Sequence, residues 1–170
     1  MKTSTIQLYS LSYNTLKTWL VAALFILGNI LLPQIVHLAP QGGITWLPIY
    51  FFTLIAAYKY GWRVGVITAI ASPIVNHLLF GMPAAAILPT ILVKSTILSL
   101  LAGYVAYRSQ RASLLMLALV VLGYQLLGSL FEWLYTGSIE AAMQDLTLGI
   151  PGIVLQIFGG WAVINLLIRK

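Results

Sequence analysis

The sequence predicts an all-α integral membrane protein, folded as a compact bundle of six transmembrane helices in one domain over residues 1–170. Hydrophobic residues make up 61% of the chain and charged residues only 7%, whereas soluble globular domains carry about 25% charged residues. A chain with so little polar surface cannot face water on all sides, so its exterior must face lipid. Its length leaves room for about six spans of about 20 residues, joined by short connections.

The first two predicted helices flank a connection rich in proline and glycine. A polar arm precedes the first apolar run, and no A-x-A-type cleavage site follows that run, so a cleaved signal peptide is not expected. The first helix is predicted over 17–36, with Pro33 near its end. The second is predicted over 46–60, which is short for a span, and it opens with Pro48 near the first turn, where proline is tolerated.

Four further helices complete the predicted bundle, over 62–79, 84–107, 113–135 and 148–168, with a polar segment over 136–147. Three of them carry small residues at about four-residue spacing. Small residues let helix backbones approach closely, which favours association in lipid, so the pattern predicts a compact bundle. The small residues are Gly65, Ala69, Ser72, Ser95, Ser99, Gly103, Gly152 and Gly160.

The distribution of charge predicts the orientation of the bundle. With six spans, the loops on one side contain Glu140 and Asp145 and neither lysine nor arginine. The positive-inside rule then places both termini in the cytoplasm, an N-in/C-in topology. The same asymmetry accounts for the formal net charge of +6 without nucleic acid as a partner. The cations on the cytoplasmic side are Lys2, Lys17, Lys59, Arg63, Arg108, Arg111, Arg169 and Lys170.

Polar residues within the predicted helices are the strongest candidates for a site. Lys94 shares a helix face with Thr90 at four-residue spacing, and Gln125 and Glu132 lie on one face of the next helix. Lys94 and Glu132 could form a buried ion pair that joins the two helices. Alternatively, Lys94 lies in a polar pocket and meets an anionic or carbonyl group of a ligand, or its ammonium snorkels to the interface. The first two interpretations are compatible.

Five more residues are candidates for the wall of a pocket near the outer face. Asn76 and His77 lie at the outer end of the third helix, where a histidine can also serve as a hydrogen-bonded loop anchor. Gln41, Trp46 and Trp133 lie at or beside the outer loops, where aromatic residues often form the interfacial belt of a membrane protein instead.

Several kinds of chemistry have no motif in this chain. It contains no G-x-x-x-x-G-K-[ST] nucleotide-binding sequence, no H-E-x-x-H, no cysteine and no G-x-S-x-G. We therefore expect a protein that is not an enzyme and that uses neither a metal ion nor a cofactor.

The region 42–103 resembles a known family. A glycine-rich loop precedes L-P-I-Y-F-F-T-L-I-A-A-Y-K-Y-G, and G-V-I-T-A-I-A-S-P-I-V-N-H-L-L-F-G-M-P-A-A-A-I-L-P-T-I-L-V-K follows. This region, with its F-G-M-P…L-P signature, resembles the substrate-binding (S) components of energy-coupling factor (ECF) vitamin transporters. Such proteins often have an acidic residue near the position of Lys94.

The resemblance implies a multi-pass protein of the bacterial inner (cytoplasmic) membrane that binds a vitamin or vitamin precursor near the outer face. ATPase subunits and a transmembrane coupling subunit would then drive uptake. Small residues on the first helix contact the coupling subunit in this family, and their nearest equivalents here are Ala22, Ala23 and Gly28. An alternative is a six-span scaffold protein of the cell-shape (MreD-like) kind, which binds protein partners and no small molecule.

Overall fold

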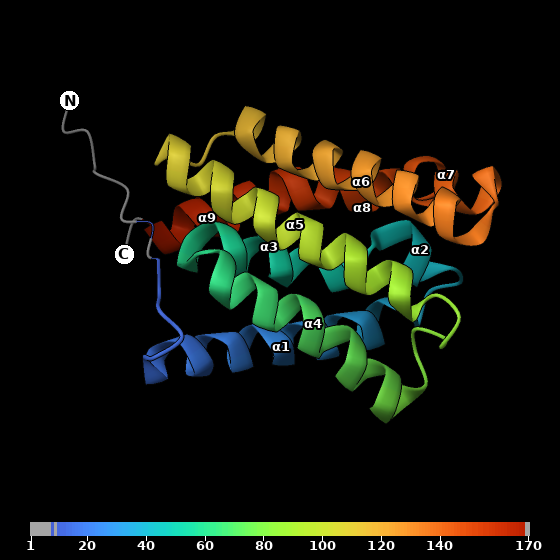
Figure 1. The fold of residues 1–170 in the computed structure, drawn as a ribbon, viewed down its shortest axis with the longest axis horizontal. Coiled ribbons are helices and arrows are strands. Elements are labelled where there is room, and N and C mark those ends of the chain that lie inside the picture. Colours follow the sequence, from blue (N-terminus) through green and yellow to red (C-terminus); the bar gives the residue numbers. More distant parts are fainter. Residues whose placement is uncertain (1–7, 9, 169–170) are drawn as a thin grey trace.

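The computed structural model describes residue 8 and residues 10–168, and this part of the chain is helical and contains no strand (Figure 1). The last helical run changes pitch, because a short π-helix, η1, lies between α8 and α9. The elements are α1 (Leu16–Val36), α2 (Gly42–Trp46), α3 (Pro48–Tyr60), α4 (Trp62–Phe80), α5 (Leu88–Ser109), α6 (Leu114–Thr136), α7 (Ile139–Thr147), α8 (Ile150–Val154), η1 (Leu155–Gly159) and α9 (Gly160–Ile168).

Within the described residues, five helical runs are long and apolar enough to cross a membrane. They are α1, α4, α5, α6 and the run Ile150–Ile168, which consists of α8, η1 and α9. The chain is therefore a multi-pass helical membrane protein in its composition and architecture. The remaining predicted span, the second, corresponds to α2 and α3, which are 5 and 13 residues long.

The predicted helix over 46–60 is divided at Leu47. This residue has a left-handed backbone with φ 47° and ψ 47°, and Pro48 follows it as the first residue of α3. Proline has no N–H to donate and clashes with a preceding helical turn, so a helix can start there but not continue through it. The one predicted helix is thus two, and Trp46 belongs to α2.

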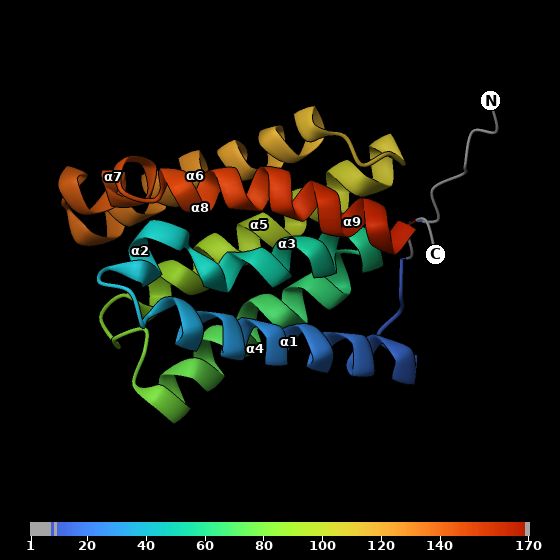
Figure 2. The same cartoon turned by 180° about the vertical axis from the view of Figure 1, so that it is seen from behind.

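Helix α3 lies in the middle of the bundle, where α1, α4, α5 and α9 contact it (Figure 2). Its residues from Leu54 to Tyr58 are 0% exposed. A helix of 13 residues rises only about 20 Å. Helix α3 is short, but its neighbours surround it. Little of its backbone therefore faces lipid.

Small residues allow the close helix contacts. A Cβ atom added to Gly65 of α4 would collide with Ala57 of α3, and one added to Gly103 of α5 would lie 2.5 Å from the Cβ of Trp62. The glycines thus allow α4 to pack against α3 and α5 at short range, the geometry that joins helices in lipid.

A buried polar junction connects three helices. Asn29 of α1 donates its side-chain amide to Thr53 of α3 at 2.9 Å and to Ser72 of α4 at 3.2 Å. In return, Asn76 of α4 donates to the carbonyl oxygen of Asn29 at 2.9 Å. Hydrogen bonds between membrane helices contribute about 0.6–2 kcal/mol each, so the junction fixes α1 against α3 and α4. Sequence analysis did not single out Asn29.

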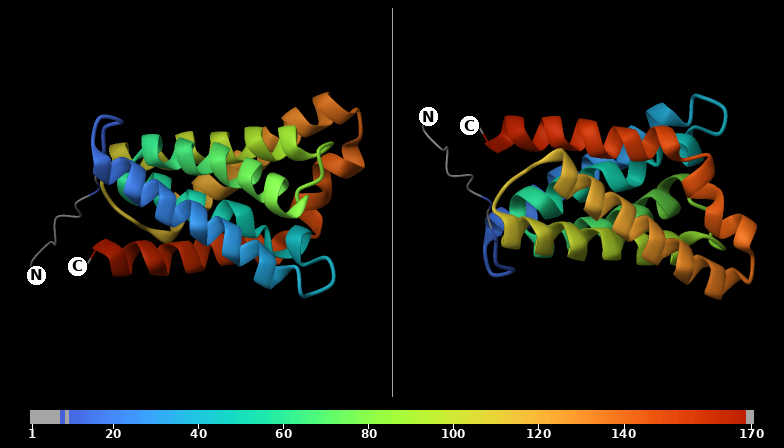
Figure 3. Two further views of the ribbon diagram at one scale, coloured as in Figure 1. Left: turned by 90° about the horizontal axis from the view of Figure 1, so that it is seen from below. Right: turned by 90° about the horizontal axis from the view of Figure 1, so that it is seen from above.

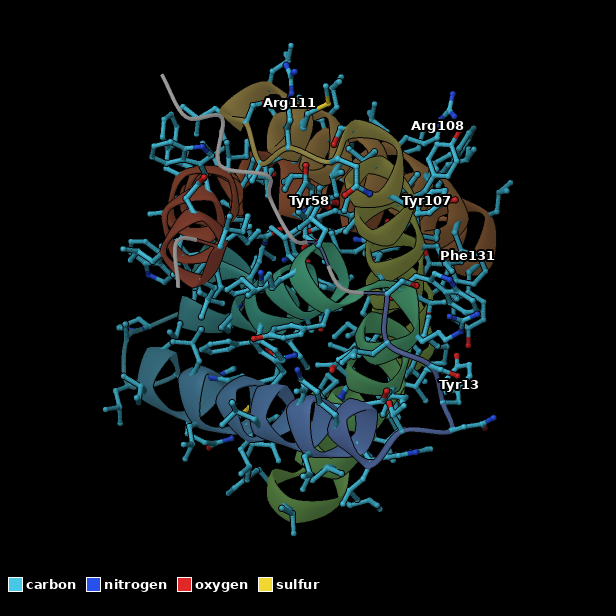
Figure 4. All side chains as sticks on the ribbon, turned by 90° about the vertical axis from the view of Figure 1, so that its left-hand side faces the viewer. Tyr13, Tyr58, Tyr107, Arg108, Arg111 and Phe131 are labelled. Atoms are coloured by element: carbon cyan, nitrogen blue, oxygen red, sulfur yellow. The ribbon has the colours of Figure 1, made fainter. Side chains whose placement is uncertain are left out.

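The two ends of the bundle differ in charge. The start of α1, the α5–α6 connection and the end of α9 lie at one end, and α2 and α7 lie at the other (Figure 3). Arg108 and Arg111 lie at the first end, near Tyr58, whose hydroxyl donates to the carbonyl oxygen of Arg111 at 2.6 Å (Figure 4). We call this the basic end, and the end with α2 and α7 the cavity end. Lys17, Lys59 and Arg63 also belong to the basic end, since they lie where α1 starts, α3 ends and α4 starts.

In three places the elements differ from the prediction by more than two residues. Helix α5 begins at Leu88 rather than at residue 84, because Pro89 is well suited to a first helical turn. The segment predicted as a polar connection over 136–147 contains α7, whose first turn is capped by the Ser138 side chain, which accepts from the N–H of Ala141. The third is the division of α2 from α3. Lys2, Arg169 and Lys170 lie outside the described residues.

Candidate functional site: a cavity with a buried lysine and two carboxylates

A cavity of about 730 Å³ lies at the cavity end of the bundle. Pockets for drug-sized ligands usually have about 300–1,000 Å³ and walls that are mostly apolar with a few polar groups. The walls come from the end of α1, the α1–α2 connection, α2, the start of α3, the α4–α5 turn and parts of α4, α5, α6 and α7. The polar and titratable residues among them include Gln34, His37, Gln41, Tyr50, Asn76, Thr90, Lys94, Glu132, Gln144 and Asp145.

Lys94 is the central charged group of the wall. Its side chain is 2% exposed, and its ammonium donates to Glu132 Oε2 at 2.5 Å and to Asp145 Oδ2 at 2.8 Å. The two carboxylates come from α6 and α7, and their side chains are 12% and 17% exposed. A buried ammonium is costly unless it is paired and hydrogen-bonded, and here it has two anionic partners on different helices.

Helices α5 and α6 together position the lysine. Lys94 lies six residues after Leu88, the first residue of α5, which corresponds to a depth of about 9 Å along the helix axis. A Cβ atom at Gly128 would collide with the Cγ of Lys94. The aliphatic part of Lys94 therefore lies directly against the α6 backbone, and its ammonium reaches Glu132, one turn farther along α6.

Asp145 lies in the last turn of α7, and a tight turn follows this helix. A Cβ atom at Gly149 would collide with the carbonyl oxygen of Asp145, so the chain can turn this closely only at a glycine. The side chain of Asp145 then faces the cavity from the far side of Lys94.

Thr90 adds an uncommitted polar group to the wall. It lies one turn before Lys94 on α5 and is 2% exposed, and its Oγ1 has no hydrogen-bond partner among the described residues. More than about 90% of buried polar groups in proteins are hydrogen-bonded. The Thr90 hydroxyl is therefore available to a group in the cavity.

The opposite wall is built from groups that already have partners. The His37 ring contacts the carbonyl oxygen of Pro33 through Nδ1 at 2.6 Å. Asn76 donates to Asn29 and accepts from the Gln34 amide at 3.5 Å. These side chains shape the wall of the cavity, while the charged groups face them from α5, α6 and α7.

Five of the nine predicted pocket residues lie on the cavity wall. The buried ion pair and the polar pocket, considered above as two interpretations of Lys94 and Glu132, occur together in the structure. The five residues are Lys94, Glu132, Asn76, Thr90 and Gln41.

The other four lie elsewhere, so we do not assign them to the cavity. The His77 ring contacts the carbonyl oxygen of Pro83 through Nδ1 at 2.7 Å and anchors the α4–α5 turn. Gln125 is fully buried and donates to the Tyr124 hydroxyl, which in turn donates to Gln156 of η1. Trp46 and Trp133 are 41% and 44% exposed and lie outside the lining of the cavity.

Several lining residues are not among those predicted from the sequence, and Asp145 and Tyr50 matter most among them. Asp145 was placed in a polar connection, although a buried lysine in a chain with only three acidic residues was a signal to test each of them as its partner. Tyr50 lies in the first turn of α3, where Pro48 was recognised but the break at Leu47 was not.

The residues expected to contact a coupling subunit are divided between two faces of α1. Ala22 is 1% exposed and belongs to the core, and a Cβ atom at Gly28 would lie 2.8 Å from the ring of Phe52 on α3. Ala22 is thus buried, and half-buried Gly28 packs against α3. Only Ala23 faces outward.

The polar groups of this cavity can make ion pairs and hydrogen bonds. The described residues contain no group of three or more histidine, cysteine, aspartate or glutamate side chains that could hold a metal ion. Two carboxylates, a lysine and a free threonine hydroxyl instead offer directed contacts to an organic molecule. Neither a model of a known protein family, nor a curated protein sequence, nor a solved structure matches the chain.

Proposed function

We propose that this protein is the substrate-binding subunit of an ATP-driven vitamin transporter of the energy-coupling factor type. In this proposal the cavity binds a vitamin or vitamin precursor near the outer face of the bacterial cytoplasmic membrane. The chain binds and presents its ligand without transforming it chemically, and uptake requires other subunits.

The observation that carries this proposal is the charged wall of the cavity. Ionisable groups within a membrane bundle are costly and usually mark a functional path or site. Lys94, Glu132 and Asp145 lie together on the wall of a cavity of about 730 Å³. A scaffold protein that binds only protein partners needs neither the cavity nor charged groups lining it, so the same observation favours the transporter subunit over the scaffold.

The proposed orientation has six spans, with α2 and α3 together serving as the second, and both termini in the cytoplasm. The concentration of cations at the basic end supports this orientation through the positive-inside rule. The cavity end then faces outward, where a dilute nutrient would be captured. The outward face of α1 around Ala23 is the proposed contact with a coupling subunit, since a small exposed residue permits close approach.

The experiment is to identify what the purified protein carries and whether it transports it. The protein is purified in detergent and denatured, and released small molecules are identified by mass spectrometry against a mock purification. We expect a vitamin-sized compound in about equimolar amount. Proteoliposomes that contain the protein alone should bind this compound without accumulating it, and added coupling and ATPase subunits should confer ATP-dependent uptake. Absence of any enriched compound, or accumulation by the chain alone, would contradict the proposal.

A further inference from the structure

The charged groups of the cavity wall do not balance. Among the described residues that line the cavity, the lysine, aspartate and glutamate side chains are Lys94, Glu132 and Asp145, and they give the formal charge of the wall. Two carboxylates therefore share one ammonium. The lysine is held by both of them, at 2.5 and 2.8 Å, so one negative charge in this wall has no full counter-charge.

The count of hydrogen-bonding positions leads to the same result. An ammonium has three donors, and Lys94 uses two of them on the carboxylates. Each carboxylate has about four acceptor positions, so the unused acceptors outnumber the one N–H that Lys94 has left. An anionic ligand would have to approach two carboxylates, whereas a cationic N–H donor would meet unused acceptors. This count favours a cationic group over the anionic or carbonyl group that the sequence suggests for Lys94.

Two neighbouring groups suit a positively charged nitrogen. The Thr90 hydroxyl is 2% exposed, has no partner among the described residues, and can accept a hydrogen bond. Tyr50 also lines the cavity, and a cation over a tyrosine ring is stabilised electrostatically.

We propose that the cavity takes an organic ligand with a protonated or permanently positive nitrogen, which binds Asp145 while Glu132 retains Lys94. Asp145 is assigned to the ligand because it makes the longer bond to Lys94 and is the more exposed of the two carboxylates, at 17% against 12%. This inference rests on the proposed function, because it names the class of molecule that the cavity accepts.

The test uses three probes with one ring and different charges. Pyridoxamine carries an ammonium group, pyridoxine a neutral hydroxyl and pyridoxate a carboxylate. Thermal unfolding of the detergent-purified protein is followed with each probe at millimolar concentration. We expect pyridoxamine to raise the midpoint most and pyridoxate least. Asp145→Asn should weaken pyridoxamine binding by about tenfold or more, the usual effect of losing a charged hydrogen bond.

Glu140→Gln is the matched control, since Glu140 is exposed on the same helix and does not line the cavity. It removes the same charge and should leave the order of the probes unchanged. Without any probe, Asp145→Asn should unfold at or above the wild-type midpoint, because Lys94 and Glu132 then form a balanced pair. A midpoint well below wild type would make Asp145 a structural residue and overturn the inference.

The outcomes separate this inference from the proposed function. Pyridoxate could instead raise the unfolding midpoint most, and Ala84→Trp, which fills the cavity, could abolish this effect. That result would overturn the charge inference and leave a ligand-binding cavity. If no probe binds but a compound is released from the purified protein, a positively charged nitrogen in that compound supports the inference, and its absence refutes it. If no probe binds and no compound is released, both proposals fail.

Discussion

Lys94 is 2% exposed, and its ammonium bonds two carboxylates that come from separate helices. Burying a charged group costs several kcal/mol, and the cost is offset only by close partners with good hydrogen-bond geometry. The lysine therefore offsets the cost of placing two carboxylates together, and one carboxylate is enough to balance the lysine. Substituting one of these charged side chains should therefore change stability differently from substituting all three.

Lys94→Met should lower the free energy of unfolding by about 3–5 kcal/mol, the usual cost of leaving a buried charge without its partner. The two carboxylates would remain close together with no cation between them. Denaturant or thermal unfolding in detergent micelles measures the effect. The triple variant Lys94→Met, Glu132→Gln, Asp145→Asn should recover most of the loss, since no buried charge remains. If Lys94→Met and wild type have the same free energy of unfolding, the charged wall does not depend on this lysine.

Gly128 is the second residue on which the cluster depends. A Cβ atom there would collide with Lys94, so Gly128→Ala should displace the lysine from its carboxylates and lower the unfolding midpoint. The effect is expected although alanine favours a helix over glycine by up to about 1 kcal/mol. Gly123→Ala on the same helix is the control, because its Cβ atom would lie 3.4 Å from Leu101, an ordinary contact. If both variants unfold alike, the close packing of Lys94 on α6 is not important for stability.

At the scale of elements, the cavity exists because the second apolar segment is divided into α2 and α3. The left-handed backbone at Leu47 ends α2 beside the mouth of the cavity, and α3 then enters the core. Helix α2 is held in place by α8, since a Cβ atom at Gly152 would lie 2.5 Å from the backbone of Trp46. The shape of this wall thus depends on a glycine in another helix.

Gly152→Ala should push α2 away from α8 and open the wall of the cavity. We expect a lower unfolding midpoint and a smaller amount of co-purified small molecule. Gly160→Ala is the control in the same helical run, because its Cβ atom would meet only the end of the flexible Leu54 side chain, at 3.1 Å. Normal ligand content in Gly152→Ala would show that the α2–α8 contact does not shape the site.

Sequence patterns predicted the long helices well and the short ones poorly. Helices α1, α4 and α6 begin and end within one residue of the predicted ranges, because their apolar runs are bounded by charged or turn-forming residues. The break at Leu47 was missed because a left-handed leucine has no sequence signature of its own. Helix α7 was missed because it is short and polar, and its residue Asp145 was therefore not assigned to the site.

For the molecule as a whole, the proposed function requires that the cavity end faces outward. The natural chain has no cysteine, so single cysteines report their side of the membrane directly. Glu140→Cys at the cavity end should react with an impermeant thiol reagent in intact cells, and Arg111→Cys at the basic end should react only after permeabilisation. Both residues are exposed, so a difference reflects sidedness rather than burial. Labelling of Arg111→Cys in intact cells would reverse the orientation.

From the sequence, only those site residues could be predicted whose type is rare in an apolar helix. Lys94 and Glu132 were found because charged side chains are conspicuous in apolar helices. The size of the cavity and the excess of carboxylates depend on contacts between segments that are far apart in the sequence, such as the pairing of Lys94 with Asp145. No periodicity within one helix contains that information.

The central claim is that the cavity holds a small molecule, and native mass spectrometry of the intact protein tests it most directly. Ala84 lines the cavity and is exposed, whereas its exposed neighbour Ala85 does not line it. Ala84→Trp should therefore fill the mouth of the cavity, and Ala85→Trp should leave it open. We predict that wild type and Ala85→Trp carry one additional mass of vitamin size and that Ala84→Trp does not. The same additional mass on all three proteins, or on none of them, would contradict the account.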